Sequence, residues 1–201
     1  MELLLVHLTD IHIRDDEDLD VLSARTDSIG GAICNHITNP DETEVVFCVT
    51  GDLAFFGKDD QYAAAGLILD EIYSLINKRY PKVGIHSVFV PGNHDCNFDA
   101  PEEEVREPLL ISPALDISKP SVLKACTAIQ KNFYAFGEEW DKKNGAMFCD
   151  DDKILTVNEL NFDSYGVHLK FHCINTSWCS KKHEEKGKMK ITTGKMSMVT
   201  D

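Results

Sequence analysis

Several absences narrow what this chain of 201 residues can be. No run approaches the ~20 consecutive apolar residues that a membrane-spanning helix needs. The seven cysteines are scattered and include no Cys-x-x-Cys pair, which favours free thiols in a reducing compartment. The apolar run up to Leu8 is too short and lacks the basic flank of a secretory signal. We therefore expect a soluble, cytoplasmic protein that does not enter a membrane.

Basic residues are also scarce. The chain carries 20 Lys and Arg against 34 Asp and Glu, a formal net charge of −14, and most of the excess lies in the first 120 residues. Contacts to phosphate backbones and anionic lipids need Lys and Arg, so long duplex nucleic acid is not the expected partner. The acidic runs at residues 15–18 and 102–104 are predicted to be solvated faces of loops.

Three short apolar runs, at residues 3–8, 45–50 and 87–90, are typical of fully buried strands. Between them, residues 21–36 and 59–80 are predicted to be helices, since breaks at Pro40 and Pro81 separate each from the next run. Apolar positions in the second helix recur at helical spacing. The alternation of strand and helix predicts an α/β fold that begins with parallel strands and right-handed crossovers.

The second half of the chain is less regular. Residues 96–120 contain four prolines and are predicted to be an inserted loop at the rim of the site. A helix is expected over 121–143, followed by antiparallel strands at 146–149, 154–162 and 165–175. In the last strand His168 and His172 share the polar face, so we expect them to be exposed and not to bind metal.

Four further residues invite a simple structural interpretation. His7 lies inside the first strand and is expected to be a core histidine with a satisfied hydrogen bond. Cys48 and Cys173 fall in predicted strands and are expected to pack as small apolar residues. Cys96 lies close to the polar segment after the third strand, but packing is again the expected role.

Polar side chains follow each of the first three strands. Asp10 and His12 follow the first, Asp52 the second, and Asn93 and His94 the third. Each segment alone could be an ordinary turn. Together, however, they meet at the carboxyl edge of a parallel sheet, where such folds bind ligands. Carboxylate, imidazole and amide groups suit divalent Mn, Fe, Zn or Mg, so we expect a metal site, with two ions bridged by Asp52.

The order of these segments resembles a known family. Residues 10–12 read Asp-Ile-His, residues 51–57 read Gly-Asp-Leu-Ala-Phe-Phe-Gly, and residues 92–95 read Gly-Asn-His-Asp. Calcineurin-like metallophosphoesterases carry similar motifs in the same order, each after a strand. The resemblance is strong over residues 1–100 and implies a mixed β-sheet sandwich flanked by helices. Because the third motif ends in Asp and no Asp-Arg-Gly follows the second, the phosphodiesterase-type branch is the closer match.

The resemblance also implies roles for the site residues. Asp10 and His12 would bind the first of two divalent ions, Asp52 would bridge both, and Asn93 would bind the second through its amide oxygen. The next two residues of the third motif, His94 and Asp95, would not bind the ions. His94 would face the substrate as a proton donor and stabiliser of the transition state.

Asp95 is expected to orient the His94 imidazole, as carboxylates commonly do for working histidines. The expected reaction is phosphoester hydrolysis by a hydroxide that bridges the two ions. The substrate could be a phosphomonoester or a diester, including a nucleotide or cyclic nucleotide. Two other functions stay open: a nuclease or nucleotide-processing domain of a larger NTPase-linked signalling protein, and a non-catalytic, metal-stabilised binding module.

The family completes its site with later histidines, which this sequence does not supply in the usual pattern. No Gly-His-x-His segment occurs, and after Asp95 the only histidines are His168, His172 and His183. Residues 174–178 resemble the strand and turn that precede those ligands in the family. We therefore expect residues 1–201 to be the N-terminal portion of one domain, with the remainder of the protein as a partner and with weak metal binding. The alternative is that one of the three histidines supplies the missing nitrogen.

Overall fold

The computed structural model describes residues 1–144 and 153–183. Its first half is a strand–helix alternation: β1 (Glu2–Leu8), α1 (Asp16–His36), β2 (Thr43–Thr50), α2 (Asp59–Arg79) and β3 (Gly84–Val90). The three strands form a parallel sheet in the order β1-β2-β3, as the sequence predicted. No helix in the described ranges is long and apolar enough to cross a membrane.

The second half adds helices and a hairpin. In chain order these are α3 (Glu103–Ile111), α4 (Pro120–Thr127), the 3₁₀ turn η1 (Ala128–Gln130), α5 (Lys131–Asn144), β4 (Leu155–Phe162), η2 (Asp163–Tyr165), β5 (Val167–Ile174) and η3 (Ser177–Cys179). The β4–β5 pair is antiparallel, as predicted. The strand predicted at 146–149 falls outside the described residues.

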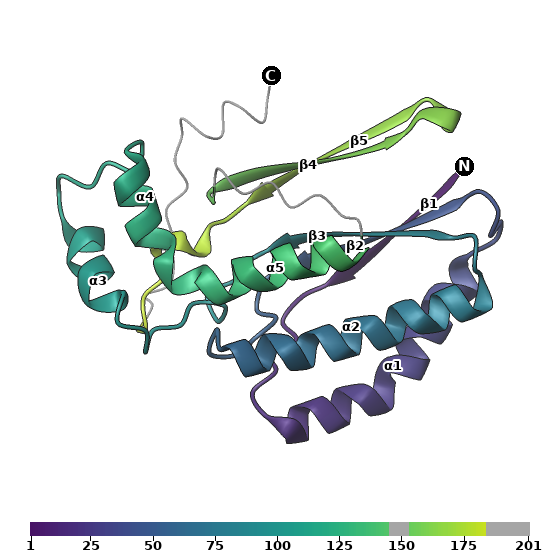
Figure 1. Ribbon diagram of the computed structural model, residues 1–201, viewed down its shortest axis with the longest axis horizontal. Helices are drawn as coiled ribbons and strands as arrows, with labels where there is room; N and C mark the ends of the chain where they lie inside the picture. The colour runs from purple at the N-terminus through teal and green to yellow at the C-terminus, as the bar shows by residue number, and fades with distance from the viewer. Residues whose placement is uncertain (145–152, 184–201) are drawn as a thin grey trace.

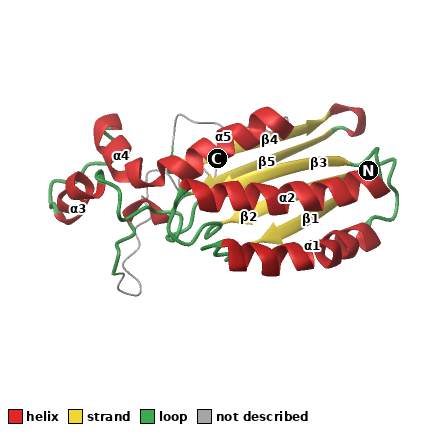
Figure 2. Ribbon diagram, turned by 60° about the horizontal axis from the view of Figure 1, so that its bottom comes forward, coloured by secondary structure: helices red, strands yellow, loops and turns green. Residues whose placement is uncertain are grey.

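The elements form layers around the parallel sheet (Figures 1 and 2). Helices α1, α2 and α5 cover one face, where Phe47 and Phe89 are buried at 0% and 3% exposure. The Trp140 indole of α5 donates to Ser87 Oγ of β3 at 3.0 Å and fixes α5 on this face. The β4–β5 hairpin lies on the other side, where Phe162 packs on the His86 ring. Two sheets flanked by helices agree with the α/β sandwich that the sequence indicated.

β1 is less buried than predicted, because it is the edge of the three-stranded sheet. Its side chains alternate: Leu4 and Val6 pack against the core, whereas Leu5 is 55% exposed. The expectation of a core histidine at position 7 is also wrong, since His7 is exposed and its Nε2 lies 2.5 Å from Thr50 Oγ1.

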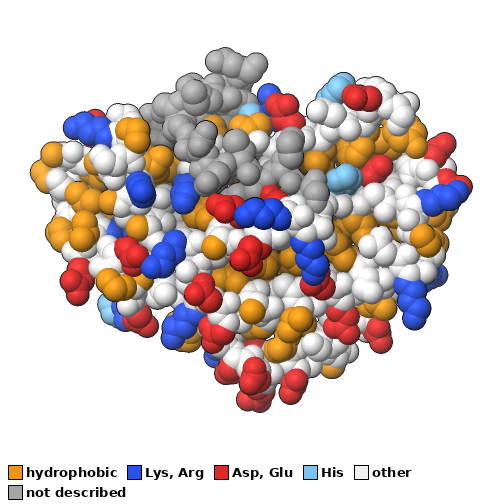
Figure 3. All heavy atoms as spheres, viewed as in Figure 1, with side chains coloured by type: hydrophobic (Ala, Val, Ile, Leu, Met, Phe, Trp, Pro, Cys, Tyr) orange, Lys and Arg blue, Asp and Glu red, His pale blue; other side chains and the backbone are white. Residues whose placement is uncertain are grey.

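The acidic run at 15–18 is not a loop. The Asp15 side chain accepts hydrogen bonds from the backbone N–H groups of Glu17 and Asp18 and so caps α1. The residues that follow form the first helical turn, where negative charge favours the helix dipole. Figure 3 shows acidic side chains gathered over this part of the molecule. The helix therefore begins five residues earlier than its apolar pattern suggested.

The segment 96–120 also differs from the predicted loop, because it contains α3 despite Pro108. Arg106 of α3 is fully buried, and its guanidinium donates to the carbonyls of Cys126, Trp178 and Ser180 at 2.6–2.8 Å. One side chain thus binds α3 to α4 and η3. The single helix expected over 121–143 is divided by η1 into α4 and α5.

Residues with expected packing roles are mostly placed as predicted. Cys96 is buried in a small apolar cluster that includes Ile129, and burial raises its pKa. Cys173 is buried and Cys48 is half-buried. His168 is exposed on β5 as predicted. His172 is half-buried instead.

Candidate metal centre

The loops after β1, β2 and β3 meet at one edge of the sheet, as the parallel topology requires. Three of their residues adopt the left-handed backbone region although none is glycine: Asp10 (φ 55°), His12 (φ 56°) and Asp52 (φ 54°). This conformation costs roughly 1–2 kcal/mol for an L-residue. Such strain concentrates where a side chain must be aimed at a ligand. All three strained positions carry a predicted metal ligand.

Backbone hydrogen bonds hold the first two loops against each other. Asp10 N–H donates to the Gly51 carbonyl at 3.2 Å, and His12 N–H donates to the Asp52 carbonyl at 2.9 Å. Beyond them an isolated parallel bridge joins Ile13 to Ala54. These bonds offset the strain and set the spacing between the side chains of the two loops.

Glycine allows the second and third loops to touch. Gly51 has φ 98°, and a Cβ added there would lie 2.9 Å from the Gly92 Cα. A Cβ on Gly92 would overlap with the carboxylate of Asp52. A side chain at Gly51 would therefore push the backbone of the third loop away, and one at Gly92 would displace the Asp52 carboxylate.

The ligand atoms of His12, Asp52 and His94 lie within 4.8 Å of one another. His12 Nε2 is 3.6 Å from Asp10 Oδ1 and 3.9 Å from Asp52 Oδ2. These separations exceed a hydrogen bond but match two atoms that bind one ion, since ligands about 2.1 Å from a tetrahedral ion stand about 3.4 Å apart. The donor set therefore fits a divalent cation of the borderline class.

His94 is fixed by the second loop. Its backbone N–H donates to Asp52 Oδ1 at 2.9 Å, and its ring Nδ1 lies 3.0 Å from the Phe55 carbonyl. A carbonyl can only accept, so Nδ1 carries the hydrogen and Nε2 is the atom left for chemistry. The imidazole packs edge-on against the His12 ring, with centroids 4.6 Å apart.

Asp95 is completely buried, and its carboxylate links the second and third loops. Its carboxylate accepts hydrogen bonds from the N–H groups of Gly92, Ala54 and Leu53 at 2.8, 3.0 and 3.4 Å, and from the Tyr62 hydroxyl at 2.9 Å. Burial raises the pKa of Asp95 to about 6, against the opposing effect of these donors.

Asp95 is expected to orient the His94 imidazole, and in the structure its carboxylate does not bond the ring directly. The ring is held by the Phe55 carbonyl, and Asp95 instead anchors the segment from Leu53 to Ala54 that leads to Phe55. The carboxylate can influence His94 through this backbone and through the Gly92 N–H at the start of the third loop.

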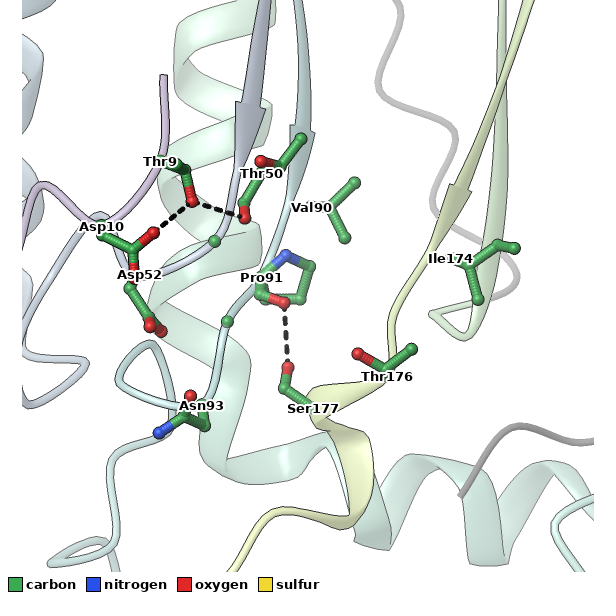
Figure 4. Close-up of a pocket in the computed structure, with 12 residues that line it drawn as sticks. Thr9, Asp10, Thr50, Asp52, Val90, Pro91, Asn93, Ile174, Thr176 and Ser177 are labelled. Carbon is green, nitrogen blue, oxygen red and sulfur yellow. Dashed lines mark hydrogen bonds between the residues drawn. The ribbon is translucent and has the colours of Figure 1, made fainter. Parts of the chain in front are cut away.

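A cavity of about 440 Å³ opens beside the cluster (Figure 4). Asp10, Asp52 and Asn93 border it, so the predicted ligands Asp10 and Asn93 reach the same space as Asp52. Thr176 and Ser177, which follow β5, line the far wall, and Ser177 Oγ is 2.9 Å from the Pro91 carbonyl. The structure thus brings four predicted metal ligands and His94 to one edge.

Two contributors were missed from the sequence. Phe55 acts through its backbone carbonyl, which leaves no signature in the residue type. Tyr62 lies on the buried face of α2 and is 2% exposed, but its hydroxyl donates a hydrogen bond to Asp95. A tyrosine on a buried helix face requires a polar partner, and this was the available signal.

Comparison with protein families supplies an independent assignment. The model of a family described as calcineurin-like phosphoesterase matches residues 3–190, which include all three motifs and the β4–β5 hairpin. Comparison with curated proteins and with solved structures gave no match. Since the matched region spans most of the sequence, the chain belongs to the calcineurin-like phosphoesterase family.

Proposed function

We propose that this chain is a metal-dependent phosphodiesterase that works with two divalent cations. The observation that carries the proposal is the convergence of His12, Asp52 and His94 from three separate loops, with ligand atoms within 4.8 Å. Family membership supports metal-dependent hydrolysis of phosphoesters in general. The diester preference rests on the third motif, which ends in Asp95, and on the absence of Asp-Arg-Gly after Asp52.

Four residues are proposed to hold the ions. Asp10 and His12 would bind one ion, Asn93 the other, and Asp52 both, in line with its position between His12 and the cavity. Bound divalent ions would supply positive charge to the phosphate oxygens and increase the acidity of the attacking water. The strained backbone of the β1 and β2 loops keeps these side chains aimed at the site before any ligand arrives.

His94 is proposed to donate a proton to the departing oxygen. Because Nδ1–H is committed to the Phe55 carbonyl, the proton that moves is the one on Nε2 of the protonated ring. General acid assistance of this kind contributes about 10²–10⁴-fold in rate. Asp95 and Tyr62 support this function by fixing the backbone that carries the Phe55 carbonyl.

Metal content and turnover measured together test the proposal. The chain would be stripped with a chelator and reloaded with Mn²⁺. It would then be assayed on bis(p-nitrophenyl) phosphate, p-nitrophenyl phosphate and single-stranded DNA. We expect Mn²⁺-dependent hydrolysis of the diester in preference to the monoester. Faster hydrolysis of the monoester would make the enzyme a phosphatase, and preferred cleavage of DNA would favour the nuclease alternative. Bound metal without any turnover would make the chain a binding module.

A further inference from the structure

Beside His94 lies a group of aromatic rings and cations that the proposed hydrolysis does not use. The Phe55 ring is 4.6 Å from the His94 ring, and the Phe56 ring is 4.7 Å from that of Phe55. The Arg14 guanidinium lies 4.4 Å above Phe55, and Lys58 Nζ lies 5.3 Å from the Phe56 centroid. We refer to Arg14, Phe55, Phe56 and Lys58 as the ring–cation cluster.

The cluster is open to solvent and has unused binding capacity. Phe56 is 47% exposed, which is unusual for a phenylalanine, and the Arg14 side chain is 56% exposed. Arg14 Nε is 3.8 Å from Asp18. Within residues 1–144 and 153–183 no hydrogen bond donated by the two terminal nitrogens of Arg14 is found, so both can donate to an anion.

The cluster is also rigidly supported. Gln61 of α2 is buried, and its amide nitrogen donates to the Arg14 carbonyl at 3.1 Å. Its amide oxygen accepts from the backbone N–H groups of Phe56 and Lys58 at 2.8 and 3.4 Å. One buried side chain therefore sets the spacing between the Arg14 loop and the Phe56 loop. A ligand that bound both would not have to order them first.

The chemistry of the cluster selects a particular ligand. An exposed ring flanked by cations stacks well with a nucleobase, and a planar guanidinium pairs with phosphate. The acidic first turn of α1, which includes Asp16 and Glu17 close to Arg14 in the sequence, would repel a continuous phosphate backbone more strongly than a single phosphate group.

We propose that the ring–cation cluster is a nucleotide subsite, in which the base stacks on Phe56 and a phosphate group pairs with Arg14. The proposal rests on the proposed function, because contact through Phe55 places such a ligand next to His94. It identifies the natural substrate as a phosphodiester that contains a nucleotide.

Binding without metal tests the subsite apart from catalysis. In the presence of a chelator, the full chain would be titrated with AMP, adenosine and ribose 5-phosphate. Saturation-transfer NMR would be read on the adenine protons of AMP and adenosine and on the ribose protons of ribose 5-phosphate. We expect AMP to bind more tightly than either fragment. Because turnover is not needed, AMP binding would survive even if the chain proved to have no hydrolase activity.

Variants locate the ligand. Phe56→Ala should weaken AMP binding by about fivefold or more, as expected for loss of one base-stacking contact. Arg14→Ala should weaken AMP binding while leaving adenosine binding unchanged, because adenosine has no phosphate. Tyr165→Ala and Arg25→Ala are matched controls, since Tyr165 is 39% exposed in η2 and Arg25 is exposed on α1. Neither should alter AMP binding.

Three results would overturn the proposal. One is equal AMP affinity in Phe56→Ala and Tyr165→Ala. Another is ribose 5-phosphate binding as tightly as AMP, which would reduce the cluster to a general anion site. The third is an oligonucleotide that binds far more tightly than AMP with steep salt dependence, which would make the ligand a nucleic acid.

Discussion

Asp52 joins two of the three loops that form the site, since its carboxylate accepts a hydrogen bond from the His94 backbone and approaches His12 Nε2. Asp52→Asn keeps the size and one carbonyl oxygen but removes the charge. We expect metal occupancy to fall and the Mn²⁺-dependent rate to drop at least about 100-fold, because loss of a metal ligand costs more than loss of its supporting hydrogen bonds. Elemental analysis and steady-state assays would measure both.

Asp41→Asn is the matched control for this substitution, because Asp41 is exposed and pairs only with Lys82 at 3.2 Å among the described residues. Its metal content and rate should equal those of the wild type. Retention of two ions and most of the activity by Asp52→Asn would exclude the bridging role.

His94 should affect rate and not metal binding. For His94→Asn we expect unchanged metal content and a loss of about 10²–10⁴-fold in rate. The loss should be larger for esters with poor leaving groups, because these need protonation most. A series of aryl phosphodiesters would give this dependence. A uniform loss across the series would indicate charge stabilisation without proton transfer, and loss of metal would make His94 a ligand.

Site residues that act through their side chains could be predicted from the sequence, because the residue type shows the chemical group. Asp10, His12, Asp52 and Asn93 follow strands, and the parallel sheet brings them to one edge. The partner of His94 could not be predicted, because any residue offers the carbonyl that Phe55 supplies.

At the level of elements, the start of β1 is attached to the loop after α1 by one carboxylate. Glu2 accepts hydrogen bonds from the N–H and hydroxyl of Thr38, both at 3.0 Å, from Asn39 N–H at 3.2 Å and from the Thr43 hydroxyl at 2.8 Å. These donors, with Thr43 the strongest, lower the pKa of Glu2 to about 2.

A depressed carboxyl pKa stabilises the folded state above the unfolded pKa, which is about 4.5 for Glu2. This contribution should be lost as pH falls from about 4.5 toward 2. Glu2→Gln should therefore lower the melting temperature at pH 7 and flatten its decline in that acid window. Glu71→Gln, an exposed change on α2, should do neither. Parallel melting curves for wild type and Glu2→Gln across the window would contradict the assignment.

Arg106 attaches α3 to the rest of the fold, as Glu2 attaches the start of β1. Replacing it with Met would leave the carbonyls of Cys126, Trp178 and Ser180 without this donor in a buried position. Breaking such a network costs about 3–5 kcal/mol. Urea denaturation would give the loss in unfolding free energy, with Arg25→Met as an exposed control. A loss below about 1 kcal/mol would mean that the hydrogen bonds of Arg106 contribute little to the unfolding free energy.

Helices and strands with a regular apolar pattern could be predicted from the sequence, and those without one could not. The predicted helix over 59–80 agrees with α2, because an apolar stripe marks its buried face and Pro81 lies just beyond its end. α3 was not predicted, because Pro108 lies inside it and one of its two buried residues is the charged Arg106. Tertiary contacts of this kind leave no periodic signal in the sequence.

On the scale of the whole molecule, His12 is the one imidazole among the four proposed metal ligands, because His94 is assigned to the departing oxygen. We expect residues 1–201 to bind Mn²⁺ weakly. A dissociation constant near 100 μM would make 1 mM Mn²⁺ stabilise the fold by only about 1.4 kcal/mol. Calorimetric titration and melting curves with and without chelator would measure this. Tight binding of two ions would mean that the chain supplies further ligands.

The left-handed backbone conformations of Asp10, His12 and Asp52 lower the thermal stability of the fold but position side chains that the proposed function needs. Glycine adopts such angles without strain, so each residue replaced by glycine would remove a cost of roughly 1 kcal/mol together with a ligand. A laboratory selection for thermal stability alone would therefore enrich glycine substitutions at these three positions. Its most robust products would be inactive, so any effort to stabilise this protein must select for turnover at the same time.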